Sequence, residues 1–202
     1  MPMTDARQQL AARDAKLAGI LTGPPFKAYR HSYLFLDLLE AITSQQLSGK
    51  AATTIFERFL NLFPRRQPTP CRLLALQPEQ LRAAGLSRQK AGYLHNVAAF
   101  ALRHDLSRAA LRHLGDDEII ALLTQIKGVG RWTTEMLLMF PLDRPDVFPV
   151  DDLGIQIAIK KLYGLRGDSL RLRMRMTAIA ENWRPHRSLA CKYLWRWRSN
   201  QR

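Results

Sequence analysis

Residues 124–134 read Thr-Gln-Ile-Lys-Gly-Val-Gly-Arg-Trp-Thr-Thr and bring two glycines together with two cations. Gly128 and Gly130 interrupt two amphipathic runs, 118–126 and 131–140, each of which predicts a helix. Glycine tolerates φ > 0 without a Cβ clash, so the pair predicts that the backbone reverses tightly between the two helices, with both glycines free to adopt a positive φ.

The start of the second predicted helix is suited to an anion. The first N–H groups of any helix lack a helical acceptor and lie at the positive end of its dipole, and here Lys127 and Arg131 flank them in the sequence. A phosphate group is the obvious partner for such a helix end. The alternative interpretation is an ordinary corner between two helices of an all-α protein, with no ligand.

Two carboxylates, Asp151 and Asp152, precede a further predicted helix over 153–163. One aspartate can cap the helix N–H groups while the other projects away from them. A carboxylate held at a helix start can stabilise a cationic, oxocarbenium-like sugar centre or take a proton from water, as in glycoside hydrolysis. The alternative is that both aspartates are helix caps and nothing more.

The tryptophan side chains also have a structural and a functional interpretation. Trp132 follows the hairpin directly, and its ring either packs in the core or offers a π-face on which a nucleobase stacks. Near the C-terminus, Tyr193 and Trp195 lie among arginines at helical spacing. We expect these two aromatic side chains to pack, and the arginines around them to face solvent or phosphate.

Composition favours a polyanionic partner. The 202 residues include 31 Lys and Arg against 17 Asp and Glu, a net charge of +14, and such an excess most often serves nucleic acid. The cations are spread through the chain rather than gathered in one amphipathic segment, which disfavours a membrane surface. Cys71 and Cys191 lie far apart, so no disulfide framework, zinc site or iron–sulfur cluster is expected. With no apolar signal segment at the N-terminus, we expect a soluble, cytoplasmic protein.

The periodicity of the chain predicts an all-α fold of ten to twelve mostly short helices, because no stretch alternates with period two. Residues 6–18 predict one short helix, and 33–42 predict a central buried helix. Polar residues then break the pattern, and Ser48 is expected to cap a long helix over 49–63.

Five stretches in one consistent order resemble a known family. Together they are similar to the helix-hairpin-helix DNA glycosylase superfamily with its Gly/Pro-rich loop and aspartate, and within it to the alkylbase group, 3-methyladenine DNA glycosylase II. The resemblance covers about 26–197, and the five stretches are 41–52, 81–91, 122–134, 146–154 and 183–190.

The resemblance implies an architecture. Members fold as two helical lobes with the active site in the cleft between them. Here lobe one would span approximately 36–140, and lobe two approximately 1–35 plus 141–202. The chain looks like the compact form of the family, without the extra N-terminal α/β domain.

The resemblance also implies roles for individual residues. Asp152 matches the family's catalytic aspartate, Asp151 would be structural, and Trp132 would line the base pocket. The hairpin residues that would hold the DNA backbone are Lys127, Gly128, Val129, Gly130, Arg131 and Thr133.

The chemistry implied is narrow. Relatives that also cut the DNA backbone carry a nucleophilic lysine two positions after the second hairpin glycine, where this chain has Trp132. An indole cannot form a Schiff base, so a monofunctional glycosylase that leaves an abasic site is implied. Members often bind a monovalent cation, Na⁺ or K⁺, through hairpin carbonyls, here those of Thr124, Ile126 and Val129. No iron–sulfur cluster and no other cofactor are expected.

The turn Gln45-Gln46-Leu47 matches the segment from which the family fills the gap left by a flipped base. Gln46 takes the position of the intercalating wedge, and Leu47 lies beside it, so both are candidates. Without the resemblance, a polar turn between two helices is the simpler interpretation.

The implied function is excision of alkylated bases of the 3-methyladenine and 7-methylguanine type from damaged double-stranded DNA, which initiates base excision repair. The nucleotide must first leave the stack, after which Asp152 would assist hydrolysis of the N-glycosidic bond. The alternatives are a helix-hairpin-helix glycosylase for deaminated or etheno bases and a non-catalytic DNA-binding hairpin protein; an RNA-binding domain is disfavoured because no single-strand module is present. We expect a monomer that has no membrane association and joins the nucleoid through DNA.

Overall fold

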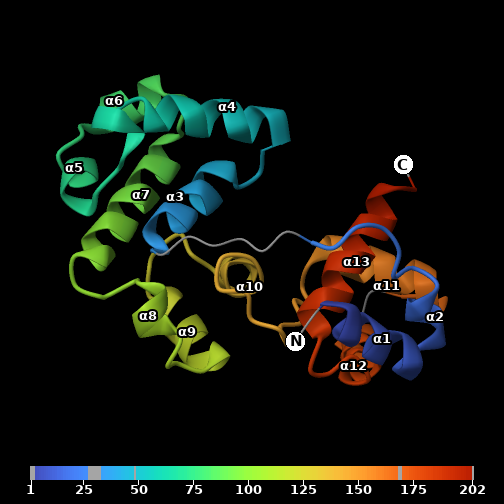
Figure 1. Cartoon of the computed structure of the whole chain (residues 1–202). Coiled ribbons are helices and arrows are strands. Elements are labelled where there is room, and N and C mark those ends of the chain that lie inside the picture. The colour runs from blue at the N-terminus through green and yellow to red at the C-terminus, as the bar shows by residue number, and fades with distance from the viewer. Residues whose placement is uncertain (1–2, 27–32, 48, 168–169, 202) are drawn as a thin grey trace. The chain divides into compact units, whose positions relative to one another are not determined.

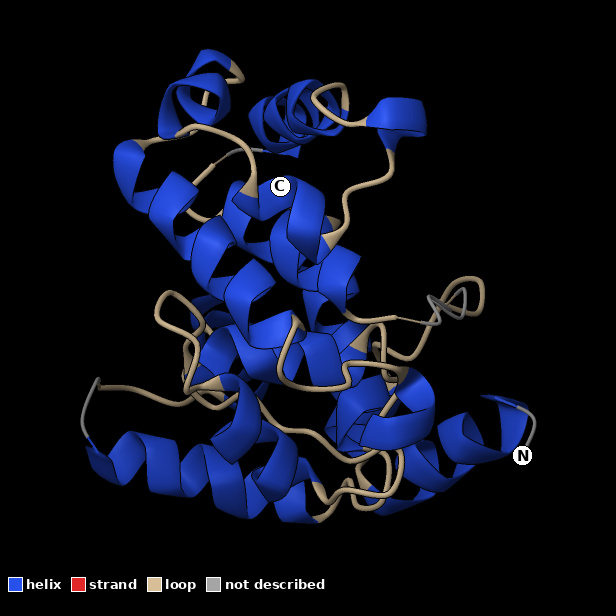
Figure 2. Cartoon of the chain, turned by 90° about the vertical axis from the view of Figure 1, so that its left-hand side faces the viewer, coloured by secondary structure: helices blue, strands red, loops and turns tan. Residues whose placement is uncertain are grey.

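The computed structural model describes residues 3–26, 33–47, 49–167 and 170–201. These residues form thirteen α-helices and one 3₁₀ helix, with no strand beyond a single antiparallel bridge between Tyr33 and Ser107 (Figures 1 and 2). The predicted all-α class is confirmed, whereas the expected cap at Ser48 falls outside the described residues. The helices are α1 (Met3–Arg13), α2 (Ala15–Ala18), α3 (Phe35–Ser44), α4 (Gly49–Leu60), η1 (Pro64–Arg66), α5 (Pro70–Leu74), α6 (Pro78–Ala83), α7 (Arg88–Ala101), α8 (Arg108–Leu111), α9 (Asp116–Leu123), α10 (Arg131–Met139), α11 (Leu153–Tyr163), α12 (Leu170–Glu181) and α13 (Arg187–Ser199).

The chain divides into two compact units, and each has its own core. Unit 1 comprises Met1–Tyr29 and Leu138–Arg202, and unit 2 comprises Arg30–Leu137. In unit 1, α13 packs against α1 and α11, and α11 also contacts α2, around the buried rings of Trp183 and Tyr193. In unit 2, α7 packs against α3, α5 and α6 (Figure 1). No helix in the described part of the chain is long and apolar enough to cross a membrane.

Residues 6–18 do not form the single helix that the sequence predicts. The chain leaves the helical conformation at Asp14, with φ −145° and ψ 100°, and α2 begins after it. The Oδ1 atom of Asp14 accepts the N–H of Leu17 at 3.0 Å, which is the hydrogen bond of a helix N-cap. Its Oδ2 atom accepts the Tyr163 hydroxyl at 2.5 Å and the Trp183 indole N–H at 2.9 Å. One carboxylate therefore caps α2 and fastens it to α11 and to the end of α12.

We expect Asp14→Asn to lower the free energy of unfolding at pH 7 by about 2 kcal/mol, because the amide NH2 group that replaces one carboxylate oxygen cannot accept a hydrogen bond and the remaining oxygen is no longer charged. Burial raises the pKa of Asp14, but the hydrogen bonds from Leu17, Tyr163 and Trp183 lower the pKa by more, so its net value lies below the usual one. A depressed carboxyl pKa stabilises the fold above the unfolded value of about 3.9 and loses this effect as the pH falls through the folded value.

The stability difference between wild type and Asp14→Asn should therefore shrink as the pH falls below about 4. Urea unfolding at pH 7 and pH 3 measures it. Asp5→Asn on α1, whose carboxylate accepts from Gln9, is the matched control. An equal difference at both pH values would show that the charge of Asp14 does not contribute.

Candidate functional site

The hairpin between α9 and α10 turns at only one of its two glycines. Gly128 has φ +107°, and a Cβ atom there would lie 2.3 Å from Cγ of Tyr93 on α7. Gly130 does not adopt a positive φ, and a Cβ atom there would meet nothing within 4 Å. Of the two glycines that the sequence leaves free to adopt a positive φ, only Gly128 does so. Gly128 reverses the chain against a ring, and Gly130 leaves open space at the start of α10.

Neighbouring helices of unit 2 hold the hairpin backbone in place. Gln45 Nε2, just after α3, donates to the carbonyl of Gly128 at 3.1 Å. Asn96 Nδ2 on α7 donates to the carbonyl of Lys127 at 3.1 Å. The Val129 side chain is buried. The loop is therefore held by this apolar side chain and by the two hydrogen bonds from the side-chain amides of Gln45 and Asn96. Such a loop is ordered before any ligand arrives.

The start of α10 has the features that suit an anion. Its first backbone hydrogen bond runs from the Thr134 N–H to the Gly130 carbonyl at 3.0 Å, so the three preceding residues form the first helical turn. Lys127 and Arg131 are exposed beside this turn. Arg131 Nε also pairs with the buried Glu135 carboxylate at 3.0 Å, which orients its guanidinium along α10.

Thr133, predicted to hold the DNA backbone, and Trp132, predicted to line the base pocket, differ in exposure. Thr133 is buried at 5% exposure, so a phosphate contact from this residue would come from its backbone N–H rather than its hydroxyl. Trp132 is 46% exposed, which is inconsistent with the core-packing alternative. A half-exposed indole at a helix start is placed to stack on a planar group.

Asp152 is both the cap of α11 and the candidate catalytic carboxylate. It is only 9% exposed, and its Oδ1 atom accepts the Ile155 N–H at 2.7 Å and the Trp195 indole N–H at 2.9 Å. Asp151 is exposed instead and pairs with Arg173 at 3.2 Å. The expected division into one capping and one projecting aspartate holds, with Asp152 as the cap. Both of these hydrogen bonds hold the Oδ1 atom of the carboxylate in place.

Trp195 is a functional candidate that the sequence did not reveal. It stacks on Phe140, with ring centroids 5.9 Å apart, which is the packing role expected of it. Its additional hydrogen bond to Asp152 needs Gly154, because a Cβ atom there would lie 3.0 Å from both Asp152 Oδ1 and Trp195 Nε1. A glycine in the first turn of a helix is the one signal in the sequence that could have indicated this close approach.

The resemblance implies a monovalent cation at the hairpin carbonyls, and oxygen is the donor atom that such a cation prefers. Thr124 ends α9, and the carbonyl of Ile126 accepts the Val129 N–H at 2.9 Å and keeps a second lone pair. Carbonyl oxygens at the negative end of a helix suit Na⁺ or K⁺. No cluster of three or more His, Cys, Asp or Glu side chains in the described part of the chain could hold a metal ion. Binding of an alkali cation here stays a prediction.

Both wedge candidates are accessible. Gln46 and Leu47 are exposed, and Leu47, at 37% exposure, is among the larger apolar side chains that face solvent in the described residues. Gln46 adopts φ +58°, a left-handed conformation uncommon for a residue other than glycine. The backbone at this turn is therefore held in a specific conformation.

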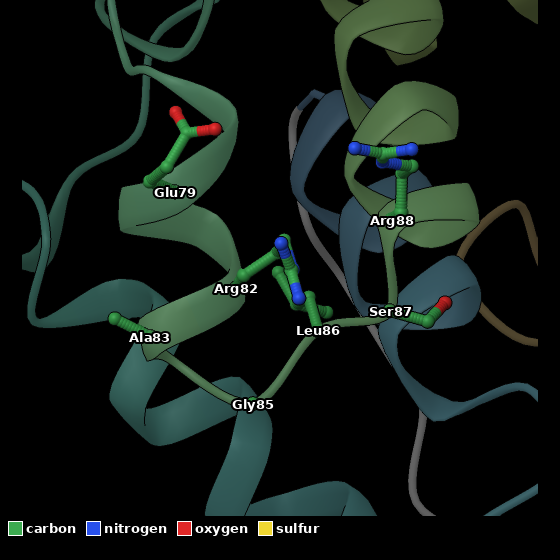
Figure 3. Close-up of a pocket in the computed structure, with 7 residues that line it drawn as sticks. All are labelled: Glu79, Arg82, Ala83, Gly85, Leu86, Ser87 and Arg88. Atoms are coloured by element: carbon green, nitrogen blue, oxygen red, sulfur yellow. The ribbon is translucent and has the colours of Figure 1, made fainter.

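Two of the surface hollows around α7 in unit 2 differ in their relation to the hairpin. One of about 370 Å³ reaches the hairpin and is lined by Arg88, Gln89, Gly92, Tyr93, Asn96 and Lys127. The other, of about 910 Å³, lies where α6 turns into α7, with Arg82 and Arg88 beside it (Figure 3). None of the predicted site residues lines the second hollow, so it is separate from the candidate site.

The comparisons with known proteins agree with these features. A family model described as HhH-GPD superfamily base excision DNA repair protein matches residues 39–185. The chain is 38% identical over 162 residues to DNA-3-methyladenine glycosylase 1 of Schizosaccharomyces pombe, covering 79% of this chain and 70% of that protein. It is similar in structure to the 3-methyladenine DNA glycosylase of the same yeast in complex with abasic DNA, with a TM-score of 0.83, 34% identity and 95% of each chain covered. The DNA-3-methyladenine glycosidase of Bacillus halodurans gives a TM-score of 0.83 at 32% identity, covering 100% of this chain and 91% of that one.

Proposed function

Because the chain belongs to the HhH-GPD superfamily of base excision DNA repair proteins, we propose that it is a DNA glycosylase that excises alkylated bases of the 3-methyladenine type. The observation that carries this proposal is the buried Asp152 carboxylate, fixed at the start of α11 by Ile155 and Trp195. The similarity to 3-methyladenine DNA glycosylases, at 38% identity in the S. pombe relative, supports the substrate class.

The hairpin would hold the damaged strand. The N–H groups of the first turn of α10 donate hydrogen bonds to a phosphate, and Lys127 and Arg131 add positive charge beside it. Gly130 leaves room for the backbone to approach. The net charge of +14 provides a long-range electrostatic attraction between the protein and DNA.

Cleavage then needs one carboxylate. The bond between C1′ and the base nitrogen breaks, and both electrons leave with the base. An alkylated purine starts with a positive charge and departs neutral, so it needs no general acid. The Asp152 carboxylate stabilises the cationic sugar, and water adds to C1′ and gives up its proton to this carboxylate.

Trp132 accounts for the selectivity and for the product. Its exposed indole is an electron-rich surface on which a cationic base stacks more strongly than a neutral one. It also stands where a lysine nucleophile would be needed for strand cleavage, so the product is an abasic site in an intact strand.

The proposal is tested by base release from methylated duplex DNA, followed by gel analysis with and without alkali. We expect release of alkylated purines and strand breaks only after alkali. Release of deaminated or etheno bases alone would favour a different lesion. Tight duplex binding without any release would favour the non-catalytic alternative.

Trp195→Phe is expected to lower the single-turnover rate of excision about 10-fold, because the carboxylate of Asp152 loses the hydrogen bond from the indole that helps to orient it. The phenyl ring keeps the stacking on Phe140, so the melting temperature and the affinity for DNA should change little. Trp197→Phe on the same helix is the matched control. An equal loss of rate in both variants, or a loss only in DNA affinity, would argue against a positioning role.

A further inference from the structure

The turn 45–47 is tied to α7 through a lysine. Lys90 Nζ donates to the carbonyl of Thr43 at 2.8 Å and to the carbonyl of Gln45 at 2.7 Å. Carbonyls at the C-terminal end of α3 have no helical donor, so the ammonium group caps this helix and fixes the first residue of the turn. In the described part of the chain no carboxylate pairs with Lys90. Its ammonium group therefore interacts with backbone carbonyl oxygens.

The same turn is tied to the hairpin through Gln45. The backbone carbonyl of Gln45 accepts from Lys90, and its side-chain amide donates to the carbonyl of Gly128 at 3.1 Å. Gly128 in turn lies against the Tyr93 ring, on the same helix as Lys90. The turn, the hairpin and α7 therefore form one connected cluster inside unit 2.

The position of the turn matters because of what it exposes. Gln46 and Leu47 face solvent directly after Gln45. An amide and an apolar side chain therefore project from a turn whose first residue is hydrogen-bonded to the hairpin and to α7. Side chains of this kind fill gaps between base steps, and unstacking a base costs a few kcal/mol. A wedge that is ordered beforehand retains the binding energy that a mobile loop would lose on ordering.

We propose that the hydrogen bonds of Lys90 and Gln45 fix the 45–47 turn relative to the phosphate-binding hairpin. Binding of the hairpin to the DNA backbone then places the wedge residues Gln46 and Leu47 at the damaged base pair. Lys90 is then a positioning residue for base extrusion and has no part in breaking the glycosidic bond. The inference rests on the proposed function, since it concerns a step of the same reaction.

The test compares Lys90→Met on two substrates. In one, the alkylated base is fully paired; in the other, the same lesion lies opposite an abasic site, where less stacking and pairing must be broken. We expect the single-turnover rate of Lys90→Met to fall about 10- to 100-fold on the paired substrate and about threefold or less on the other, since a few kcal/mol of unstacking is at stake. Affinity for undamaged duplex should stay within about threefold of wild type.

Two further variants and one probe make the result decisive. Lys90→Arg keeps a donor for both carbonyls and should recover part of the paired-substrate rate, and Lys16→Met on α2 removes one positive charge elsewhere as a control. 2-Aminopurine beside the lesion should show less unstacking with Lys90→Met than with wild type. Equal losses on both substrates, or wild-type rates on both, would overturn the inference. Failure of the wild type to excise either substrate would instead contradict the proposed function.

Discussion

Asp152→Asn is expected to reduce base excision by about 10²- to 10⁴-fold while leaving duplex binding intact. The amide cannot stabilise a cationic sugar as a carboxylate does, and it cannot take the proton of the attacking water. The amide oxygen can still accept the N–H groups of Ile155 and Trp195, so the helix cap and the fold should persist. For this reason asparagine is a better probe than alanine, which would also remove the cap at a cost of about 1 kcal/mol. Single-turnover base release and DNA binding together measure the effect.

The neighbouring residue supplies the control. Asp151→Asn removes the same charge one position earlier, but Asp151 is exposed and pairs only weakly with Arg173 across 3.2 Å at the surface. Its excision rate should stay within about threefold of wild type. Comparable losses in both variants would mean that the charge at this helix start matters rather than the carboxylate of Asp152. Tighter DNA binding by Asp152→Asn without any wild-type turnover would favour a non-catalytic DNA-binding protein.

Local patterns were sufficient for the class of fold and for the hairpin. Helical periodicity with caps and prolines predicted an all-α chain, and the comparisons confirm the helix-hairpin-helix family. Two glycines between amphipathic runs marked the reversal at 128–130. A pair of aspartates before an apolar run marked the start of α11. Each of these signals lies within a few residues of the feature that it predicts, which is why sequence alone could find it.

Long-range contacts decided what sequence could not predict. Asp14 ends α1 because Tyr163 and Trp183 donate to its carboxylate from 149 and 169 residues away. Trp195 reaches Asp152 across 43 residues, and Lys90 reaches the carbonyl of Gln45 across 45. No periodicity or spacing encodes such pairs, because they depend on how helices pack. The roles assigned to the individual site residues stay predictions until the variants are measured.

The two hairpin glycines illustrate the same limit and can be separated by experiment. Gly128→Ala is expected to lower the free energy of unfolding by about 3 kcal/mol or more and to abolish duplex binding, because its Cβ atom would lie 2.3 Å from the Tyr93 ring at a φ of +107°. Gly130→Ala meets no atom within 4 Å and needs no positive φ, so its stability should stay within about 1 kcal/mol of wild type. Urea unfolding and duplex titration of both variants measure the contrast.

The clash and the backbone strain at Gly128 can also be told apart. Tyr93→Ala removes the ring that the new methyl group would strike, so adding it to Gly128→Ala should relieve the clash while the unfavourable positive φ remains. The double variant should therefore be more stable than the sum of the two single losses predicts. If the losses simply add, the ring does not restrict residue 128. If Gly128→Ala is as stable as Gly130→Ala, the hairpin does not need a glycine at its reversal. In Gly130→Ala, a loss of DNA affinity without a loss of stability would locate the close approach of the phosphate backbone at the open start of α10, which is where the first helical turn presents its N–H groups.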